Sequence, residues 1–113
     1  PFEKKEDGLK SYKYSIIIEN SSEVNYFTEK LIDACLLETV PIYWGAPNIS
    51  EYFDVKGFII CENFEEIKYA ISKMSDEDYL SKIKWIKKNK KTSSYHADFK
   101  KRAALIIKQS LKD

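Results

Sequence analysis

Short apolar segments rich in β-branched and aromatic residues alternate along the chain with segments of helical periodicity. The apolar segments at residues 12–18, 40–43 and 58–61 predict three strands, and the apolar spacing at residues 28–37 and 64–72 predicts two helices. Strands and helices in this order, joined by short connections, are typical of a parallel sheet covered by helices. The continuous apolar run that ends the first strand also predicts burial on both of its faces. The sequence therefore predicts an α/β fold.

The chain is long enough for one hydrophobic core. It has 113 residues, 43% of them hydrophobic, and a chain of this length buries roughly 65% of the surface that its unfolded form exposes. We expect a single domain, with an α/β core at residues 12–75 and a helical tail at residues 76–113. A break at residues 92–94 divides the predicted tail into two helices. The second helix carries an apolar stripe at helical spacing: Phe99, Ala103, Ile106, Ile107 and Ser110.

Charge is divided unevenly along the chain, although the formal net charge is only +1. Residues 1–79 hold 8 Lys and Arg against 16 Asp and Glu, a local charge of −8, whereas residues 80–113 hold 11 against 2, a local charge of +9. The overall balance argues against a protein whose whole surface binds nucleic acid. The basic tail still permits weak contact with an anionic membrane, and nucleic acid is the less favoured partner.

Cysteine and histidine give little indication of chemistry. Cys35 and Cys61 stand in apolar segments without the CxxC spacing of zinc sites, so we expect buried, reduced thiols. His96, the only histidine, stands near the start of the last predicted helix with no Ser or Cys partner in its motif, and we assign it no catalytic role. Trp44 begins a loop with Gly and Pro at residues 44–48, where packing and a position near a nucleotide both stay open.

The segment between the first predicted strand and the following helix carries the candidate ligand-binding residues. Open α/β sheets bind ligands at the carboxyl ends of their strands, where this segment lies. With Thr28 as the N-cap, the helix start offers backbone N–H groups and a positive dipole end, both suited to a phosphate. Lys30 adds a positive charge in the first turn, and Glu29 adds a carboxylate that can accept both hydroxyls of a ribose. Each also has a structural interpretation, because a first-turn acid stabilises a helix without a ligand and a lone lysine is usually solvated.

Three neighbouring residues also have two interpretations. Tyr26, just before the N-cap, is suited to packing or to a ligand contact. Asn20 is typical of a turn, and Asn20-Ser21-Ser22 also matches the pattern of an N-glycosylation site. Glu19 ends an apolar run, so its carboxylate must be solvated or bonded to donors. A role in a site and a structural role are both open for Glu19.

Three motifs follow one another in a fixed order with short gaps. They are Tyr12-Lys13-Tyr14 leading to Glu19-Asn20-Ser21, then Asn25-Tyr26-Phe27-Thr28-Glu29-Lys30-Leu31, then Thr39-Val40-Pro41-Ile42-Tyr43-Trp44-Gly45-Ala46-Pro47-Asn48-Ile49. Together they resemble the donor-binding half of the α-1,3-fucosyltransferases of glycosyltransferase family ten. The resemblance covers roughly residues 12–64.

The resemblance implies the Rossmann-like C-terminal half of a GT-B glycosyltransferase, with a short parallel sheet covered by helices and a helical C-terminal tail. It also implies GDP-fucose as the donor substrate, no cofactor and no required metal. The donor-binding residues that it implies are Glu19 near the fucose, Asn20 and Tyr26 at the sugar or diphosphate, Glu29 at the ribose and Lys30 at the diphosphate.

By the same resemblance, the full protein is a glycosyltransferase that moves L-fucose from GDP-fucose to a hydroxyl of an N-acetylglucosamine-containing glycan. The family's general base lies in an N-terminal domain, so we expect this chain to be a fragment of a two-domain enzyme, without a catalytic residue and inactive alone. The sequence departs from the family pattern at Ile18 and Glu38, and Arg102 does not match the family's upstream basic residue.

Two further points stay open from the sequence. The alternative function is a non-catalytic module that binds a nucleotide sugar, or a contact domain for a membrane or a nucleic acid through the basic tail. We expect a cytoplasmic protein that is peripheral at a membrane, or a protein of the Golgi lumen if the source is eukaryotic.

Overall fold

A three-stranded parallel sheet lies at the centre of the molecule. The computed structural model describes the backbone of residues 13–112 and the side chains of residues 13–98. The strands are β1 (Tyr14–Ile18), β2 (Val40–Trp44) and β3 (Ile59–Ile60), in the order β1-β2-β3. The predicted α/β fold with a short parallel sheet is therefore confirmed.

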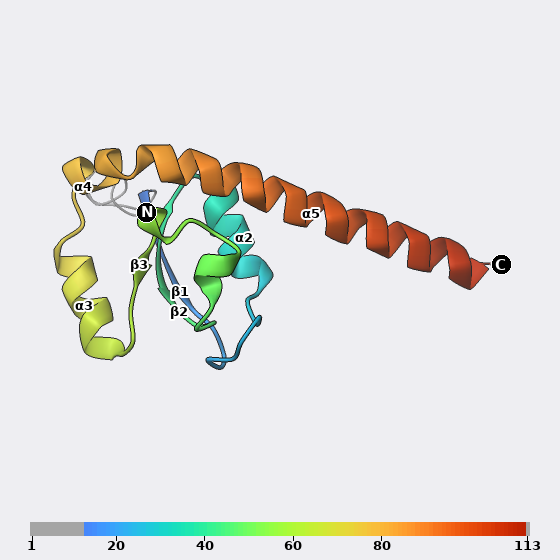
Figure 1. The fold of residues 1–113 in the computed structure, drawn as a ribbon, viewed down its shortest axis with the longest axis horizontal. Coiled ribbons are helices and arrows are strands. Elements are labelled where there is room, and N and C mark those ends of the chain that lie inside the picture. The colour runs from blue at the N-terminus through green and yellow to red at the C-terminus, as the bar shows by residue number, and fades with distance from the viewer. Residues whose placement is uncertain (1–12, 113) are drawn as a thin grey trace, which may run out of the picture.

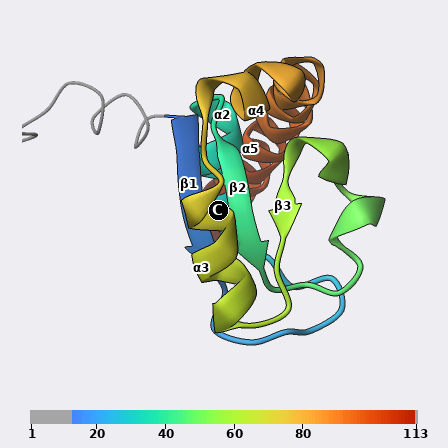
Figure 2. The ribbon, with the colours of Figure 1, turned by 90° about the vertical axis from the view of Figure 1, so that its left-hand side faces the viewer.

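The remaining elements connect the strands and cover the sheet. They are α2 (Glu29–Leu36), the 3-10 helices η1 (Ile49–Glu51) and η2 (Val55–Gly57), α3 (Phe64–Ser72), α4 (Asp76–Ser81) and α5 (Ile83–Lys112). Figures 1 and 2 show the sheet between α2 and α3, so that each of these helices lies on its own face. The helix α5 runs past α2 and extends well beyond the other elements (Figure 1).

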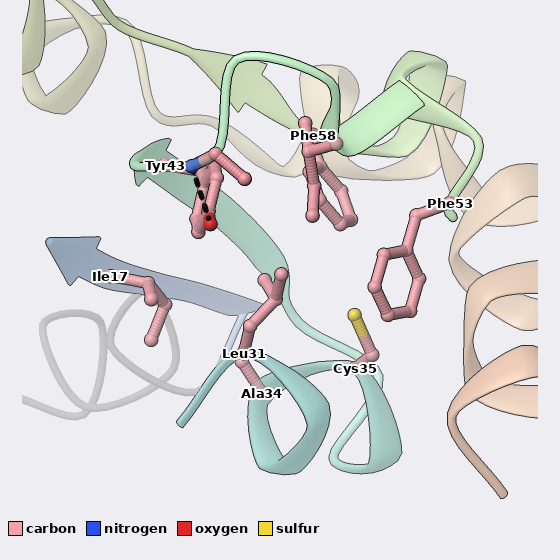
Figure 3. Close-up of a cluster of buried hydrophobic side chains, with 9 residues drawn as sticks. Ile17, Leu31, Ala34, Cys35, Tyr43, Phe53 and Phe58 are labelled. Atoms are coloured by element: carbon pink, nitrogen blue, oxygen red, sulfur yellow. Dashed lines mark hydrogen bonds between the residues drawn. The ribbon is translucent and has the colours of Figure 1, made fainter. Parts of the chain in front are cut away.

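The central strand β2 is buried on both faces. Tyr43 belongs to the apolar cluster on the α2 side, whereas Ile42 belongs to the cluster on the α3 side, because successive side chains of a strand point to opposite faces. Figure 3 shows Leu31 and Cys35 of α2 extending toward the interior that they share with Tyr43. Packing from both sides therefore fixes the position of the carboxyl end of β2.

The first strand is less buried than its apolar run predicts. Ile16 and Ile18 are about half exposed, at 50% and 49%, whereas Tyr14 and Ile17 are buried. Within the described sheet β1 is an edge strand, and α3 packs mainly over β2. The prediction that both faces of β1 are covered is therefore wrong for its second half.

The helix α5 is continuous where a break is predicted. The Thr92 hydroxyl donates to the Lys88 carbonyl at 3.2 Å, and the Ser94 hydroxyl donates to the Lys90 carbonyl at 3.1 Å. These hydroxyls find acceptors one turn back along the helix, so they do not have to interrupt it. The small side chain of Ser93 is fully buried. The predicted break at residues 92–94 is therefore wrong.

The first part of α5 belongs to the packed domain. Ile86 and Asn89 are buried, and the Asn89 amide donates to the Asp54 carbonyl and accepts from the Asp54 N–H, both at 2.9 Å. The division into a core at 12–75 and a tail at 76–113 stays a prediction. The apolar stripe predicted at residues 99–110 lies outside the described side chains.

Both cysteines are buried and free, as predicted. Burial raises the pKa of the Cys35 thiol to about 11, so this thiol stays protonated near neutral pH. Among the described helices, none has both the length and the apolar character of a membrane span.

Candidate functional site

The loop between β1 and α2, residues 19–28, joins the carboxyl end of the sheet to the amino end of a helix. The Glu19 N–H donates to the Trp44 carbonyl at 3.0 Å, which keeps the start of this loop beside the end of β2. Thr28 has an extended backbone and is the N-cap of α2, as predicted. Thr28 makes no side-chain cap hydrogen bond, because its hydroxyl donates to Glu19 instead.

The Glu19 carboxylate is buried and bonded within the chain. Only 3% of Glu19 is exposed. One carboxylate oxygen accepts from the Thr28 hydroxyl at 2.8 Å. The other accepts from the Thr28 N–H at 2.9 Å and from the Tyr43 hydroxyl at 3.2 Å. Glu19 therefore fastens the amino end of α2 to the central strand, which is a structural role. Its role near a donor sugar stays a prediction.

Gly45, which has no Cβ atom, leaves room for the side chain of Glu19. A Cβ atom on Gly45 would stand 2.5 Å from Cγ of Glu19 and 2.4 Å from the hydroxyl oxygen of Tyr43. Both neighbours are almost fully buried, so a larger residue would have to displace side chains that are already packed. The close packing of Glu19 and Tyr43 therefore favours a residue without a Cβ atom at position 45.

The other four predicted site residues lie on the same loop and helix start. Asn20 is exposed just after β1, Tyr26 is partly buried, and Glu29 and Lys30 are exposed in the first turn of α2. Lys30 is exposed to solvent, and it forms no ion pair with another residue that the structure describes. This places a positive helix end and a lysine together at the carboxyl edge of the sheet, an arrangement that suits a phosphate.

Two hydrogen-bonding residues of this region are not singled out from the sequence. The Ser22 hydroxyl donates to the Gly45 carbonyl at 2.8 Å, and the side-chain oxygen of Asn48 accepts from the Asn25 N–H at 2.8 Å. The sequence places Asn48 in the third motif, at the end of the loop at residues 44–48. Both contacts join the β1–α2 loop to the segment that follows β2.

A pocket of about 280 Å³ adjoins this loop at the carboxyl ends of β2 and β3. Trp44 and Ser22 contribute to its lining, together with residues of the loop after β2 and of the end of β3. None of the five predicted site residues lines the pocket. Packing and a position near a nucleotide both stay open for Trp44.

His96 lies in the middle of α5 and not near the start of a helix, so that prediction of its position is wrong. The His96 ring packs edge-on against Phe27 with ring centroids 5.7 Å apart, and it lies 5.8 Å from Phe53. These contacts are structural, and they place part of α5 against the β1–α2 loop.

Comparison with known proteins gives consistent matches. The family model for the C-terminal part of glycosyltransferase family 10 (fucosyltransferase) matches residues 2–109. The chain is 39% identical over 67 residues to an α-(1,3)-fucosyltransferase of Helicobacter pylori, covering 59% of this chain and 14% of that protein. It is 34% identical over 83 residues to GDP-fucose protein O-fucosyltransferase 3 of Xenopus laevis, covering 68% of this chain and 18% of that protein.

Solved structures give the same result. The crystal structure of an α1,3-fucosyltransferase with GDP-fucose superposes with a TM-score of 0.55 at 34% identity, over 73% of this chain and 26% of that chain. A structure of an α1,3-fucosyltransferase with GDP superposes with a TM-score of 0.54. The chain thus spans about a quarter or less of the length of the proteins that it matches. The α/β domain of the GT-B type, which the motifs predict, is confirmed, and the chain belongs to glycosyltransferase family 10, the fucosyltransferases.

Proposed function

We propose that this domain binds GDP-fucose at the β1–α2 loop and the amino end of α2. The observation that carries the proposal is the exposed Lys30 on a helix start that the buried Glu19 fastens to the central strand. A diphosphate requires an accessible positive site, and this edge offers the helix end and an ammonium together. The similarity to an α1,3-fucosyltransferase solved with GDP-fucose supports the choice of donor.

In the proposed complex, each predicted residue has a role that suits its chemistry. Lys30 binds the diphosphate, and Glu29 accepts the hydroxyls of the ribose. Asn20 and Tyr26 contact the sugar or the diphosphate, and Glu19 holds the loop close to the fucose. The exposure of Asn20, Glu29 and Lys30 is consistent with these roles.

The proposed reaction is a displacement at the anomeric carbon of fucose. The acceptor oxygen forms the new bond, and the diphosphate leaves with the electron pair of the broken C–O bond. Lys30 and the helix dipole stabilise the charge that develops on the diphosphate, so its departure requires neither a proton nor a metal ion. We place the general base that deprotonates the acceptor hydroxyl outside this chain, in another domain of a longer protein.

The whole protein, in this proposal, transfers L-fucose to a hydroxyl of an N-acetylglucosamine-containing glycan. We further propose that it is cytoplasmic and peripheral at a membrane, or lumenal in the Golgi of a eukaryote. The exposed lysines at the start of α5, among them Lys84, Lys87 and Lys91, support a weak contact with an anionic membrane.

Titration calorimetry of the chain with GDP, UDP and GMP tests the proposal. GDP and UDP differ in the base, whereas GDP and GMP differ in the second phosphate. We expect GDP to bind more tightly than either competitor, because the proposed edge binds the diphosphate and the family's donor carries guanine. Equal binding of all three nucleotides, or no binding of GDP at millimolar concentration, would contradict the proposal.

A further inference from the structure

Tyr26, a proposed donor contact, lies between Asn25 and Phe27 in the sequence. The side chain of Tyr52, distant in the sequence, contacts both of these neighbours. The Tyr52 hydroxyl donates to the side-chain oxygen of Asn25 at 2.7 Å. The Tyr52 ring packs edge-on against Phe27, with centroids 5.0 Å apart and planes at 60°. Tyr52 directly follows η1, on the far side of β2 in the sequence, and it therefore contacts both sequence neighbours of Tyr26.

Asn25 has a backbone conformation that needs support. Its φ is 67°, in the left-handed region, which costs most residues roughly 1–2 kcal/mol and which asparagine tolerates better than most. Asn25 and Asn48 form a reciprocal pair. The Asn25 N–H donates to the Asn48 side-chain oxygen at 2.8 Å, and the Asn48 amide donates to the Asn25 side-chain oxygen at 2.8 Å. With the Tyr52 hydroxyl, three hydrogen bonds hold this conformation.

The aromatic contact of Phe27 continues into α5. Phe27 packs edge-on against Phe53 at 5.6 Å and against His96 at 5.7 Å, in addition to Tyr52. Phe53 is buried, so the cluster is anchored in the domain core. The β1–α2 loop is therefore fixed by hydrogen bonds before Tyr26 and by ring packing after it.

We infer that Asn48 and Tyr52 are positioning residues for donor binding, an inference that rests on the proposed function. They hold the β1–α2 loop in the conformation that sets Tyr26 and the start of α2 at the binding edge. A ligand that binds only one conformation of a loop loses apparent affinity in proportion to the fraction of the protein in that conformation. Asn48 and Tyr52 thus raise affinity without contact with the nucleotide.

Four variants of the full chain distinguish the hydroxyl and ring contacts of Tyr52 from the hydrogen bonds between Asn48 and Asn25. Asn48→Ala removes the amide pair, Tyr52→Phe removes only the hydroxyl, and Tyr52→Ala removes hydroxyl and ring. Tyr95→Phe is the matched control, because Tyr95 is 75% exposed on α5. In calorimetric titration with GDP, we expect Asn48→Ala and Tyr52→Ala to weaken binding about tenfold, as a fall of the competent fraction to about a tenth requires. Tyr52→Phe should have a smaller effect, and Tyr95→Phe none.

Amide hydrogen exchange without nucleotide gives a second measurement. We expect faster exchange at residues 26–31 in the Asn48 and Tyr52 variants, with unchanged exchange in α3, which separates loop opening from unfolding. If Asn48→Ala does not fold, the two Tyr52 variants decide the test. Binding of GDP by all variants as tight as by the unchanged chain would overturn this inference alone. Absence of GDP binding by the unchanged chain would overturn the proposed function, and this inference with it.

Discussion

Truncation of the buried carboxylate at Glu19 should strongly destabilise the domain. In the Glu19→Ala variant, the Thr28 N–H and the Tyr43 hydroxyl lose an acceptor at 2.9 and 3.2 Å, and the Thr28 hydroxyl loses one at 2.8 Å. A buried donor left without a partner costs about 1–3 kcal/mol. Counting only the Thr28 N–H and the Tyr43 hydroxyl, we expect a loss of about 3–4 kcal/mol. That is a large part of a typical unfolding free energy of about 5–15 kcal/mol.

Two further variants make this prediction specific. Glu19→Gln keeps the shape and an acceptor oxygen, and its amide can donate to the Thr28 hydroxyl oxygen, so we expect a loss of only about 1–2 kcal/mol. Glu23→Ala, at an exposed acid of the same loop, should cost less than about 0.5 kcal/mol. Urea unfolding followed by tryptophan fluorescence measures all three variants, with an unchanged m-value as the sign of two-state behaviour. A cost below about 1 kcal/mol for Glu19→Ala would refute the structural role of Glu19.

Three other predictions follow from the charges of the molecule. Lys30→Ala should weaken GDP binding with almost no change in melting temperature, because an exposed lysine contributes little to stability; Lys87→Ala, at another exposed lysine, is the calorimetric control and should bind GDP normally. Burial acts to raise the pKa of Asp78, but hydrogen bonds from Lys82 and Tyr14 outweigh it and hold this pKa below its usual value. The resulting stability is present above the unfolded pKa of about 4 and is lost as the pH falls through the folded pKa. Acid unfolding of wild type should therefore begin at the same pH as that of Asp78→Asn or at a lower pH. Acid unfolding of wild type at a higher pH would show that this assignment is wrong. Co-sedimentation with anionic vesicles should fade as salt shortens the Debye length from ~10 Å at 0.1 M to ~3 Å at 1 M, whereas binding that ignores salt would argue against an electrostatic contact of α5.

Local patterns made the sheet and the first helix predictable. The strands appear as short β-branched runs, and α2 has its N-cap at Thr28, because both signals depend on residues close in sequence. The continuity of α5 was not predictable in the same way. A Thr-Ser-Ser segment interrupts many helices, and only the hydroxyl bonds to carbonyls one turn earlier show why residues 92–94 do not.

The supports of the candidate site depend on contacts across long separations in sequence. Glu19 lies 24 residues before Tyr43, and Asn25 lies 23 residues before Asn48. No local pattern contains such pairs, so the sequence leaves Glu19 with two interpretations and does not single out Asn48. The strand-to-helix position of the site is predictable, because it follows from the order of the elements.

Glu38 has an unusual backbone conformation and contacts two later helices. It follows α2 with a φ of 57°, in the left-handed region where a residue with a Cβ is strained. Its carbonyl accepts from the Tyr79 hydroxyl at 2.7 Å, and its carboxylate pairs with Lys90 at 3.0 Å. These contacts join the end of α2 to α4 and α5.

Chemical-shift mapping of GDP on the ¹⁵N-labelled chain tests most directly where the donor binds. The proposed site predicts that GDP shifts the amide signals of residues 19–31, together with those of the adjoining residues 44–48. Amides of α3, on the other face of the sheet, should not move and provide an internal control. Shifts confined to the lysine-rich start of α5, or a spectrum that millimolar GDP leaves unchanged, would contradict the proposed donor site.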